Sequence, residues 1–377
     1  MMHPIRERVH GLLAAADVRV GGDRPWDMQI HDTRLPARLL AGGSLALGES
    51  YVDGWWDTPS LDQLIGRLLA AGLDRRAPGL ADLRDAAAAR LLNLQLGRRA
   101  YAVGERHYDL GNDLYRAMLG RRLVYSCGYW HDRDGRLAGS LDDAQDAKLD
   151  LVCRKLGLRP GMRVLDIGCG WGEALKFAAE RHGVSGVGVT ISREQQAFAE
   201  ALCEGLPLEF RLQDYRELRG ERFDRVLSIG MFEHVGLRNY RGYFDLVRSL
   251  LPADGLFLLH SIGGNASRRR TDPWIARYIF PNSMLPSARQ LAEASEGLFV
   301  IEDWHCFGTD YDLTLQAWRD NIEAAWHRLP ARYDERFRRM WRYYLASSMA
   351  SFRARRSQVW QVLMSPQGVP GGIVVPR

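Results

Sequence analysis

The feature that most constrains the fold is the stretch from Val164 to Glu173, where an apolar run breaks into alternating glycines. Gly168, Gly170 and Gly172 can adopt positive φ and leave the backbone open to a ligand, because they have no Cβ atom. Their order, Gly-x-Gly-x-Gly, differs from the Gly-x-Gly-x-x-Gly of turns that cradle a dinucleotide pyrophosphate. The spacing therefore favours a cofactor without phosphate, such as S-adenosylmethionine, while a purely structural tight turn is the alternative.

The residues around this turn alternate between strand-like and helix-like patterns. Strands are predicted at 163–167, 186–190, 208–212, 223–229 and 255–260, and helices at 173–182, 193–203 and 240–250. Such alternation predicts an α/β fold with a doubly wound, mostly parallel sheet and helices on both faces. Ligands of such sheets bind where the strands end, so the chemistry is expected at the carboxyl ends of the strands.

The length of 377 residues exceeds that of a usual single domain. We predict an N-terminal domain at 1–75, a helical linker at 76–104 and a catalytic domain at 105–377. The first segment holds short apolar stretches, a predicted amphipathic helix at 61–71 and two adjacent tryptophans. Those tryptophans suit a core, and they also suit a membrane interface.

Composition narrows the class of protein. Lys and Arg number 51 against 46 Asp and Glu, a net charge of +5 that suits anionic lipid headgroups or nucleic acid. No apolar run reaches the ~20 residues of a spanning helix and the N-terminus lacks a signal-peptide core, so a cytoplasmic protein is expected. The five cysteines form no Cys-x-x-Cys pair, so neither a metal site nor a disulfide framework is expected. The sequence has no stripe of alternating basic and aromatic residues, so nucleic acid is not expected as a partner.

Polar residues follow the second and third predicted strands. Thr190 ends the second strand, where dinucleotide enzymes and many methyltransferases place an acid for the ribose, and Gln195 lies nearby. Both side chains offer hydrogen bonds without a carboxylate, which argues against nicotinamide chemistry. After the third strand, Asp214 could accept from an adenine amine while Tyr215 packs on the ring, or Asp214 could form an ordinary Asx turn.

Glu233 and His260 follow the fourth and fifth predicted strands and are expected to converge beside the cofactor methyl group. A carboxylate and an imidazole at adjacent strand ends are usual groups for handling a proton. Upstream, the aromatic segments His107–Tyr115 and Val124–Trp130 are predicted to cover the cofactor as a lid that keeps out water. Core packing is the rival interpretation of these aromatic residues.

Several motifs together closely resemble those of the cyclopropane-fatty-acyl-phospholipid synthase family. They are Gly48–Trp56, Tyr108–Asp113, Tyr125–Cys127, Met231–Gly236, Tyr278–Pro281, Asp310–Asp312 and Phe352–Gln361. The resemblance implies a class I S-adenosylmethionine-dependent methyltransferase fold with a seven-stranded sheet and a small, mainly helical, lipid-binding N-terminal domain. It further implies transfer of the methyl carbon to the cis double bond of an unsaturated acyl chain in a phospholipid. The resulting carbocation must lose a proton as the cyclopropane ring closes.

The resemblance also implies the roles of particular residues. The base is expected to be a bound bicarbonate ion, held at positions that match Cys127, Glu233, His260, Ile262 and Tyr311. Cofactor contacts are expected from Tyr125, Ser126, Gly168, Cys169, Gly170, Thr190, Gln195, Asp214 and Tyr215. Glu233 acting directly as the base is the competing assignment. Some family members carry a cysteine where this chain has Ser348, and a serine offers no thiolate for a covalent mechanism.

The same resemblance implies a homodimer that attaches peripherally to the inner membrane leaflet. Three rival functions follow from the residues. The first is the same transfer ending in a methyl-branched or methylene product, because the position of the base decides the fate of the cation. The second is a methyltransferase for a small molecule or RNA. The third is a lipid-binding protein without catalysis, against which the combination of Glu233, His260, Tyr311 and the glycine turn argues.

Overall fold

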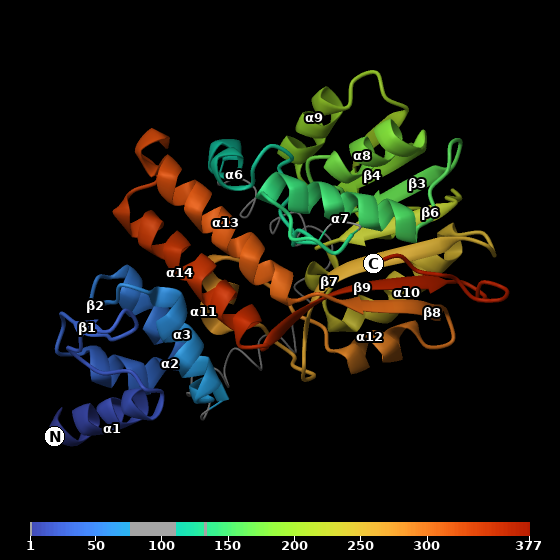
Figure 1. Cartoon of the computed structure of the whole chain (residues 1–377). Helices are drawn as coiled ribbons and strands as arrows, with labels where there is room; N and C mark the ends of the chain where they lie inside the picture. The colour runs from blue at the N-terminus through green and yellow to red at the C-terminus, as the bar shows by residue number, and fades with distance from the viewer. Residues whose placement is uncertain (1, 76–110, 132–133) are drawn as a thin grey trace.

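The computed structural model describes residues 2–75, 111–131 and 134–377. Figure 1 shows an α/β part built around one large sheet and, beside the long helices α13 and α14, a helical part formed by the N-terminal residues. The predicted linker at 76–104 lies outside the described residues.

Seven strands form one sheet in the order β5-β4-β3-β6-β7-β9-β8. The strands are β3 (Arg163–Ile167), β4 (Ser185–Thr190), β5 (Leu208–Leu212), β6 (Arg225–Ile229), β7 (Leu256–Gly264), β8 (Val300–Cys306) and β9 (Ser357–Ser365). The first five in spatial order are parallel, and β9 runs antiparallel to both of its neighbours. The strand order reverses between β3 and β6, which is where doubly wound sheets bind ligands. The predicted seven-stranded, mostly parallel sheet is confirmed.

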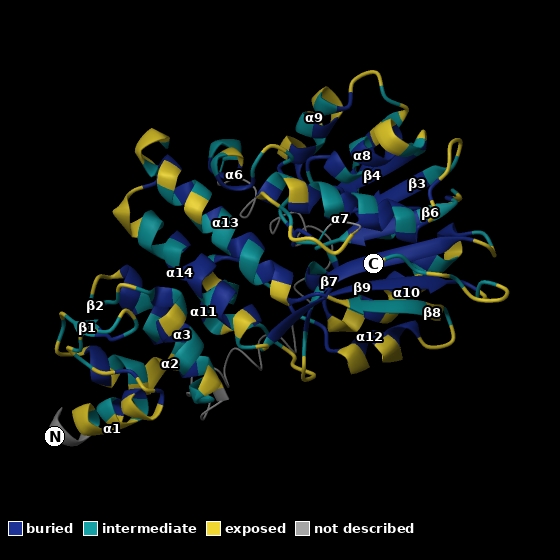
Figure 2. Ribbon diagram, viewed as in Figure 1, coloured by how far each residue is buried: buried dark blue, intermediate teal, exposed yellow. Residues whose placement is uncertain are grey.

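Helices cover both faces of the sheet because its strands are apolar on both sides. Leu165 and Phe257 pack in one cluster with α10 and α12, while Val164 and Leu256 pack in another with α7, α8 and α9. Neighbouring residues of one strand thus serve opposite faces, as the pleat requires. The helices are α7 (Leu141–Lys155), α8 (Glu173–His182), α9 (Arg193–Leu202), α10 (Tyr240–Leu250) and α12 (Ala288–Ser295). Figure 2 shows the central strands as the most buried elements of this part.

The N-terminal helices pack against the last long helices of the chain. The elements are α1 (Met2–Ala15), β1 (Gln29–Ile30), α2 (Leu35–Val52), β2 (Trp56–Asp57), α3 (Leu61–Ala70), α6 (Asn112–Met118), α11 (Pro273–Tyr278), α13 (Thr309–Ala325) and α14 (Glu335–Arg353). Trp56 is fully buried and shares one apolar cluster with Trp318 and Trp341 of α13 and α14. The domain boundaries stay a prediction, and the N-terminal helices share their core with α13 and α14.

Arginine side chains of α14 form hydrogen bonds and ion pairs with the N-terminal part of the chain. Arg339 donates to the carbonyl of Tyr51 at 2.7 Å and to the Asp57 carboxylate at 2.8 Å. Arg353 bridges Asp62 at 2.7 Å. Arg339 reaches the Tyr51 carbonyl and the Asp57 carboxylate from two different nitrogens of one rigid guanidinium group, so the contact fixes orientation as well as distance. Among the described residues, none of the helices combines the length and apolar character needed to span a bilayer.

Replacing Gly48 of α2 with alanine is expected to loosen the packing of α2 against α11. A Cβ atom at Gly48 would lie 2.4 Å from the ring of Trp274, which is itself buried. Overpacking of this kind costs about 1–3 kcal/mol of unfolding free energy. Gly66→Ala on α3 is the control, because its Cβ would meet nothing within 4 Å. Denaturant unfolding of the two variants measures the difference, and equal stability would contradict the expected clash.

Candidate functional site

The glycine turn joins the end of β3 to the start of α8 at the reversal of the strand order. Gly168, Gly170 and Gly172 all have positive φ, at 85°, 54° and 88°. The turn brings bare backbone to the carboxyl end of β3, next to the N-terminus of α8. The predicted strand, turn and helix are all observed here.

Replacing Gly168 with alanine is expected to damage this turn more than its backbone conformation alone explains. Its Cβ would lie 2.6 Å from Met231, whereas a Cβ at Gly161, with the same φ of +85°, meets nothing within 4 Å. We expect Gly161→Ala to cost about 1–2 kcal/mol and Gly168→Ala about 1–3 kcal/mol more from the clash. Thermal unfolding and the affinity for S-adenosylhomocysteine report the two effects. Equal losses in both variants would show that the clash is absent.

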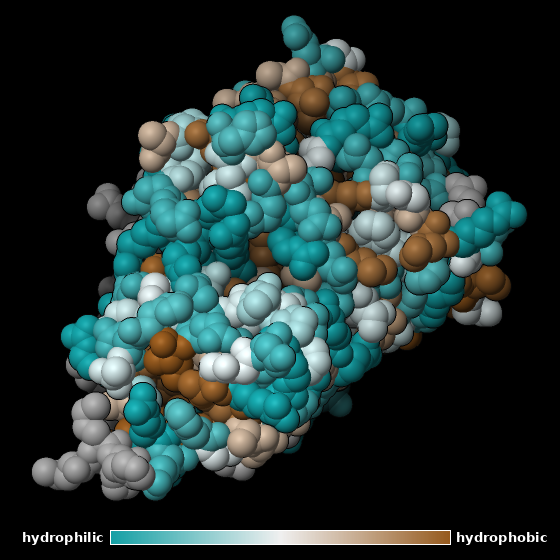
Figure 3. Space-filling model, turned by 60° about the vertical axis from the view of Figure 1, so that its left-hand side comes forward, coloured by the Kyte–Doolittle hydropathy of each residue, from teal (hydrophilic) through white to brown (hydrophobic). Residues whose placement is uncertain are grey.

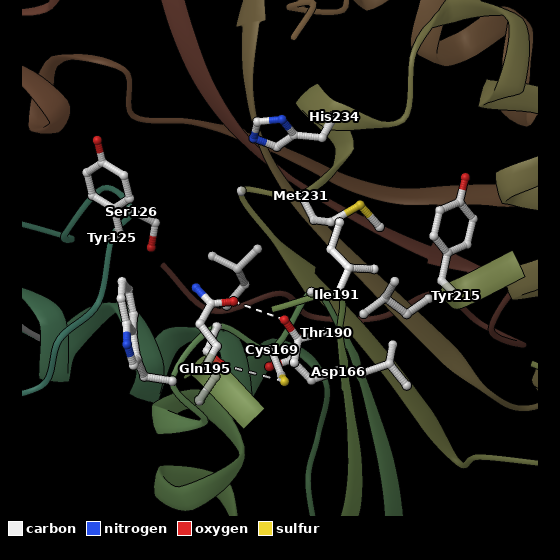
Figure 4. Close-up of a pocket in the computed structure, with 18 of the residues that line it drawn as sticks. Tyr125, Ser126, Asp166, Cys169, Thr190, Ile191, Gln195, Tyr215, Met231 and His234 are labelled. Carbon is white, nitrogen blue, oxygen red and sulfur yellow. Dashed lines mark hydrogen bonds between the residues drawn. The ribbon is translucent and has the colours of Figure 1, made fainter. Parts of the chain in front are cut away.

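One cavity opens at this turn and collects side chains from the ends of four strands (Figure 4). All nine residues predicted to contact the cofactor line it: Tyr125, Ser126, Gly168, Cys169, Gly170, Thr190, Gln195, Asp214 and Tyr215. They come from segments as far apart as the loop before α7 and the loop after β5. The contact with a cofactor stays a prediction for each residue, but the structure brings all of them to one place.

Thr190 and Gln195 form a neutral polar wall of the cavity. The Thr190 hydroxyl donates to Gln195 Oε1 at 2.9 Å, and the amide N–H of Ser192 donates to the Thr190 hydroxyl at 3.2 Å. The Ser192 side chain accepts from the Gln195 N–H and caps α9. These hydrogen bonds hold Thr190 and Gln195 in position, and neither residue brings a carboxylate to the wall.

Asp214 and Tyr215 form the next part of the wall. Asp214 accepts from the backbone N–H of Arg216 at 3.0 Å and pairs with its guanidinium, so the Asx turn is present. The same residue lines the cavity, so both interpretations of Asp214 fit the structure. Burial raises the pKa of Tyr215 to about 12, so its ring is neutral at physiological pH. Tyr215 packs edge-on against Tyr243 at 5.3 Å, which holds the ring in position.

Sequence reasoning missed several residues of this cavity. Its lining also includes Lys148, Asp166, Met231, His234, Pro281 and Asn282. Asp166 Oδ1 is buried without a hydrogen-bond partner among the described residues, and burial raises the pKa of Asp166 to about 7. A buried carboxyl group with an unsatisfied oxygen suits a ligand that donates a hydrogen bond, as the ammonium group of S-adenosylmethionine would. Its place two residues before the first glycine was the available signal.

Glu233 lies outside the lining of this cavity, in the short helix η3 (Phe232–His234) that follows β6. Its Oε1 accepts from the backbone N–H of Ile262 at 2.7 Å, which joins two of the five residues predicted to hold bicarbonate. Oε2 is buried without a partner among the described residues. Burial raises the pKa of Glu233 to about 7, so the carboxyl group exchanges its proton near neutrality.

His260 lies on β7 two residues before Ile262, so the two residues share one face of the sheet. Gln361 Nε2 lies 3.4 Å from Nδ1 of His260; with the amide in this orientation Nδ1 accepts, which leaves the proton on Nε2. Burial holds the pKa of His260 well below its usual range, so the ring stays neutral. No hydrogen bond joins Glu233 and His260 in the described part of the chain, and their predicted convergence stays a prediction.

Cys127 and Tyr311 belong to a neighbouring, mostly aromatic region. The Cys127 thiol donates to the carbonyl of Gly128 at 3.1 Å, and burial raises its pKa well above the usual range. Tyr311 packs on Phe352 at 4.6 Å and on Trp318 at 5.8 Å. Cys127 is therefore a protonated thiol, which removes it as a thiolate nucleophile.

The aromatic segment upstream of α7 does reach the cavity. Tyr125 lines it, and its hydroxyl lies 2.8 Å from that of Tyr344. The Tyr125 ring packs with those of Tyr115, Phe280 and Trp318 at 5.3, 6.2 and 5.3 Å. Tyr125 therefore belongs both to the core packing and to the lining of the cavity, and the predicted role of these segments as a lid stays a prediction. Of the first predicted lid segment, residues 107–110 lie outside the described residues.

Comparison with known proteins agrees with this geometry. Residues 96–362 match the family model of mycolic acid cyclopropane synthetase. The chain is 50% identical to the cyclopropane-fatty-acyl-phospholipid synthase of Escherichia coli K12, over 97% of this chain and 94% of that one. It is 33% identical to the tuberculostearic acid methyltransferase of Mycobacterium tuberculosis, over 89% and 82% of the two chains.

Solved structures give the same answer for the α/β part. A crystal structure of a mycolic acid cyclopropane synthase complexed with SAH and CTAB superimposes with a TM-score of 0.65 at 33% identity. It covers 70% of this chain and 98% of that chain. The chain therefore belongs to the mycolic acid cyclopropane synthetase family and is an S-adenosylmethionine-dependent methyltransferase.

Proposed function

We propose that this enzyme transfers the methyl carbon of S-adenosylmethionine to the cis double bond of an unsaturated acyl chain in a membrane phospholipid. A new bond forms between the methyl carbon and one alkene carbon, and the bond to sulfur breaks. Loss of one proton from the transferred carbon then closes the cyclopropane ring. The main structural support is Glu233 Oε2, a buried carboxyl oxygen without a partner among the described residues.

The residues around the cavity suit this reaction. S-Adenosylmethionine supplies an electrophilic methyl group when it is bound. The Tyr125 ring lines the cavity and packs on Trp318 behind it, so it keeps water out on that side and can stabilise positive charge through its ring quadrupole. A neutral aromatic ring is not a strong nucleophile toward the carbocation on the acyl chain, so the carbocation stays available for ring closure. An alkene without a heteroatom needs such a protected site.

Two of the five residues predicted to hold bicarbonate have side-chain hydrogen-bond donors that suit a small anion. Glu233 Oε2 donates a hydrogen bond while the carboxyl group is protonated, and Nε2–H of His260 is a second donor. The N–H of Ile262 is already taken by Glu233, so Ile262 acts through that side chain. A bound bicarbonate would supply a base for the departing proton. Glu233 as the direct base is the second assignment.

The membrane role is proposed for the N-terminal helices. Leu40 of α2 is 38% exposed, and it follows Arg34 and Arg38, whose guanidinium groups lie over Trp55 at 4.6 and 4.4 Å. Figure 3 shows a hydrophobic patch set among hydrophilic residues on the face of the molecule that this view presents. Arginine, tryptophan and leucine together suit the interface of an anionic bilayer. A homodimer would place two such surfaces on one membrane and strengthen attachment.

Vesicles test the proposal directly. The protein is incubated with methyl-labelled S-adenosylmethionine and vesicles of monounsaturated phospholipid, and saturated vesicles serve as the control. We expect label only in the unsaturated lipid, in a product that mass spectrometry identifies as a cyclopropane. Detection of methyl-branched or methylene lipid would show that the rival reaction takes place and not cyclopropane formation. Absence of label in lipid would overturn the proposal.

A further inference from the structure

Lys148 places a buried amino group in the wall of the cofactor cavity. It belongs to α7, its side chain is fully buried, and its Nζ donates to the Ser126 hydroxyl at 3.0 Å. Both residues line the cavity together with Asp166.

The surroundings of Lys148 leave its charge incompletely matched. The titratable and charged groups that act on it are Arg122, Cys127, Asp166, Glu173 and His260. Glu173 is already paired with Arg122 at 3.1 Å, and Cys127 is a protonated thiol. Burial lowers the pKa of Lys148 to about 7. Its ammonium group offers three donors, and in the described part of the chain only the Ser126 hydroxyl accepts one.

We infer that Lys148 binds the α-carboxylate at the amino-acid end of S-adenosylmethionine. The Ser126 hydroxyl holds the ammonium group of Lys148 in position. The cofactor carries one carboxylate, which must lose water where it enters the cavity, and a buried ammonium group compensates that loss. Figure 4 places Ser126 and Tyr215 on opposite sides of the cavity. The nucleoside fits the wall of Thr190 and Tyr215, which leaves the amino-acid end for Ser126 and Lys148. The inference concerns cofactor binding and is independent of the lipid substrate.

The variant Lys148→Met keeps the length of the side chain and removes the charge. Calorimetric titration compares S-adenosylhomocysteine with its decarboxylated analogue, which lacks only the carboxylate. We expect Lys148→Met to weaken S-adenosylhomocysteine about 10- to 100-fold and the analogue less than about 3-fold. Retained binding of the analogue also shows that the variant folds. Equal weakening of both ligands, or of neither, would overturn the inference.

Unmodified protein provides a second test that needs no variant. At pH 8, Lys148 is largely neutral in the free protein, and a bound carboxylate restores its proton. Binding of S-adenosylhomocysteine at pH 8 should therefore take up more protons than binding of the decarboxylated analogue. Titration in two buffers of different ionisation enthalpy measures this uptake. Equal uptake for both ligands would contradict a carboxylate bound at Lys148.

Discussion

Replacing Glu233 with glutamine is expected to lower the rate of cyclopropane formation at least about 100-fold while raising the stability of the protein at pH 8. Glutamine cannot exchange a proton, and positioned proton transfer contributes about 10²–10⁴-fold to rates. Its amide oxygen can still accept from the N–H of Ile262, so the fold keeps the observed contact. Label transfer to vesicles measures the rate. Undiminished turnover would remove Glu233 from both proposed schemes.

The gain in stability follows from the raised pKa of Glu233. Below about pH 4.5 the carboxyl group is protonated in both the folded and the unfolded chain, so it costs nothing. As the pH rises from there to about 7, the unfolded chain loses the proton and the folded chain keeps it, which destabilises the fold progressively. Above pH 7 the cost is constant at about 3 kcal/mol. Glu233→Gln should therefore match the native protein in free energy of unfolding at pH 4 and exceed it at pH 8.

The pH dependence of the rate separates the two roles of Glu233. A direct base must be ionised, so the rate would rise as the pH passes through about 7. A carboxyl group that holds an anion through its own proton must be protonated, and the rate would fall over the same range. Rates measured in vesicles of net neutral lipid avoid changes in membrane charge. The direction of the change near pH 7 then assigns the role.

The sequence predicted the framework of the cofactor site because local rules determine it. The alternation of strands and helices located β3, α8, β5 and α10 within a residue or two. Polar residues placed at the ends of parallel strands must meet at one edge of the sheet, which explains why Thr190 and Tyr215 line one cavity. These inferences need only periodicity and strand direction.

The remaining features depend on contacts between distant segments. Lys148 reaches the cavity from α7 and meets Ser126, 22 residues away, and no local pattern distinguishes it from a surface lysine of an amphipathic helix. The hydrogen bond from Ile262 to Glu233 uses a backbone group, which a sequence motif cannot show. The antiparallel β9, which inserts between β7 and β8, follows α14 in the chain and lies at the far end of the sequence. Such pairings become visible only in three dimensions.

Replacing Phe232 with alanine is expected to destabilise the fold by about 3–5 kcal/mol and to impair catalysis beyond that loss. Phe232 is fully buried, stacks on Tyr240 at 4.2 Å and packs edge-on against Tyr243 at 5.3 Å. It shares the single turn of η3 with Glu233, so this packing fixes the backbone that carries the carboxyl group.

A misplacement of about 1 Å can cost about 100-fold in rate, and the loss of the Phe232 packing is expected to displace the neighbouring Glu233 carboxyl group. Phe232→Leu is the matched control, because it keeps most of the apolar volume and should cost less than about 1.5 kcal/mol. Denaturant unfolding measures stability, and label transfer at a temperature where both variants are folded measures the rate. A Phe232→Ala protein that is destabilised yet fully active per folded molecule would show that Glu233 holds its position without this core. The hydrogen bond from the Ile262 N–H to Glu233 Oε1 would then be the contact that positions the Glu233 carboxyl group.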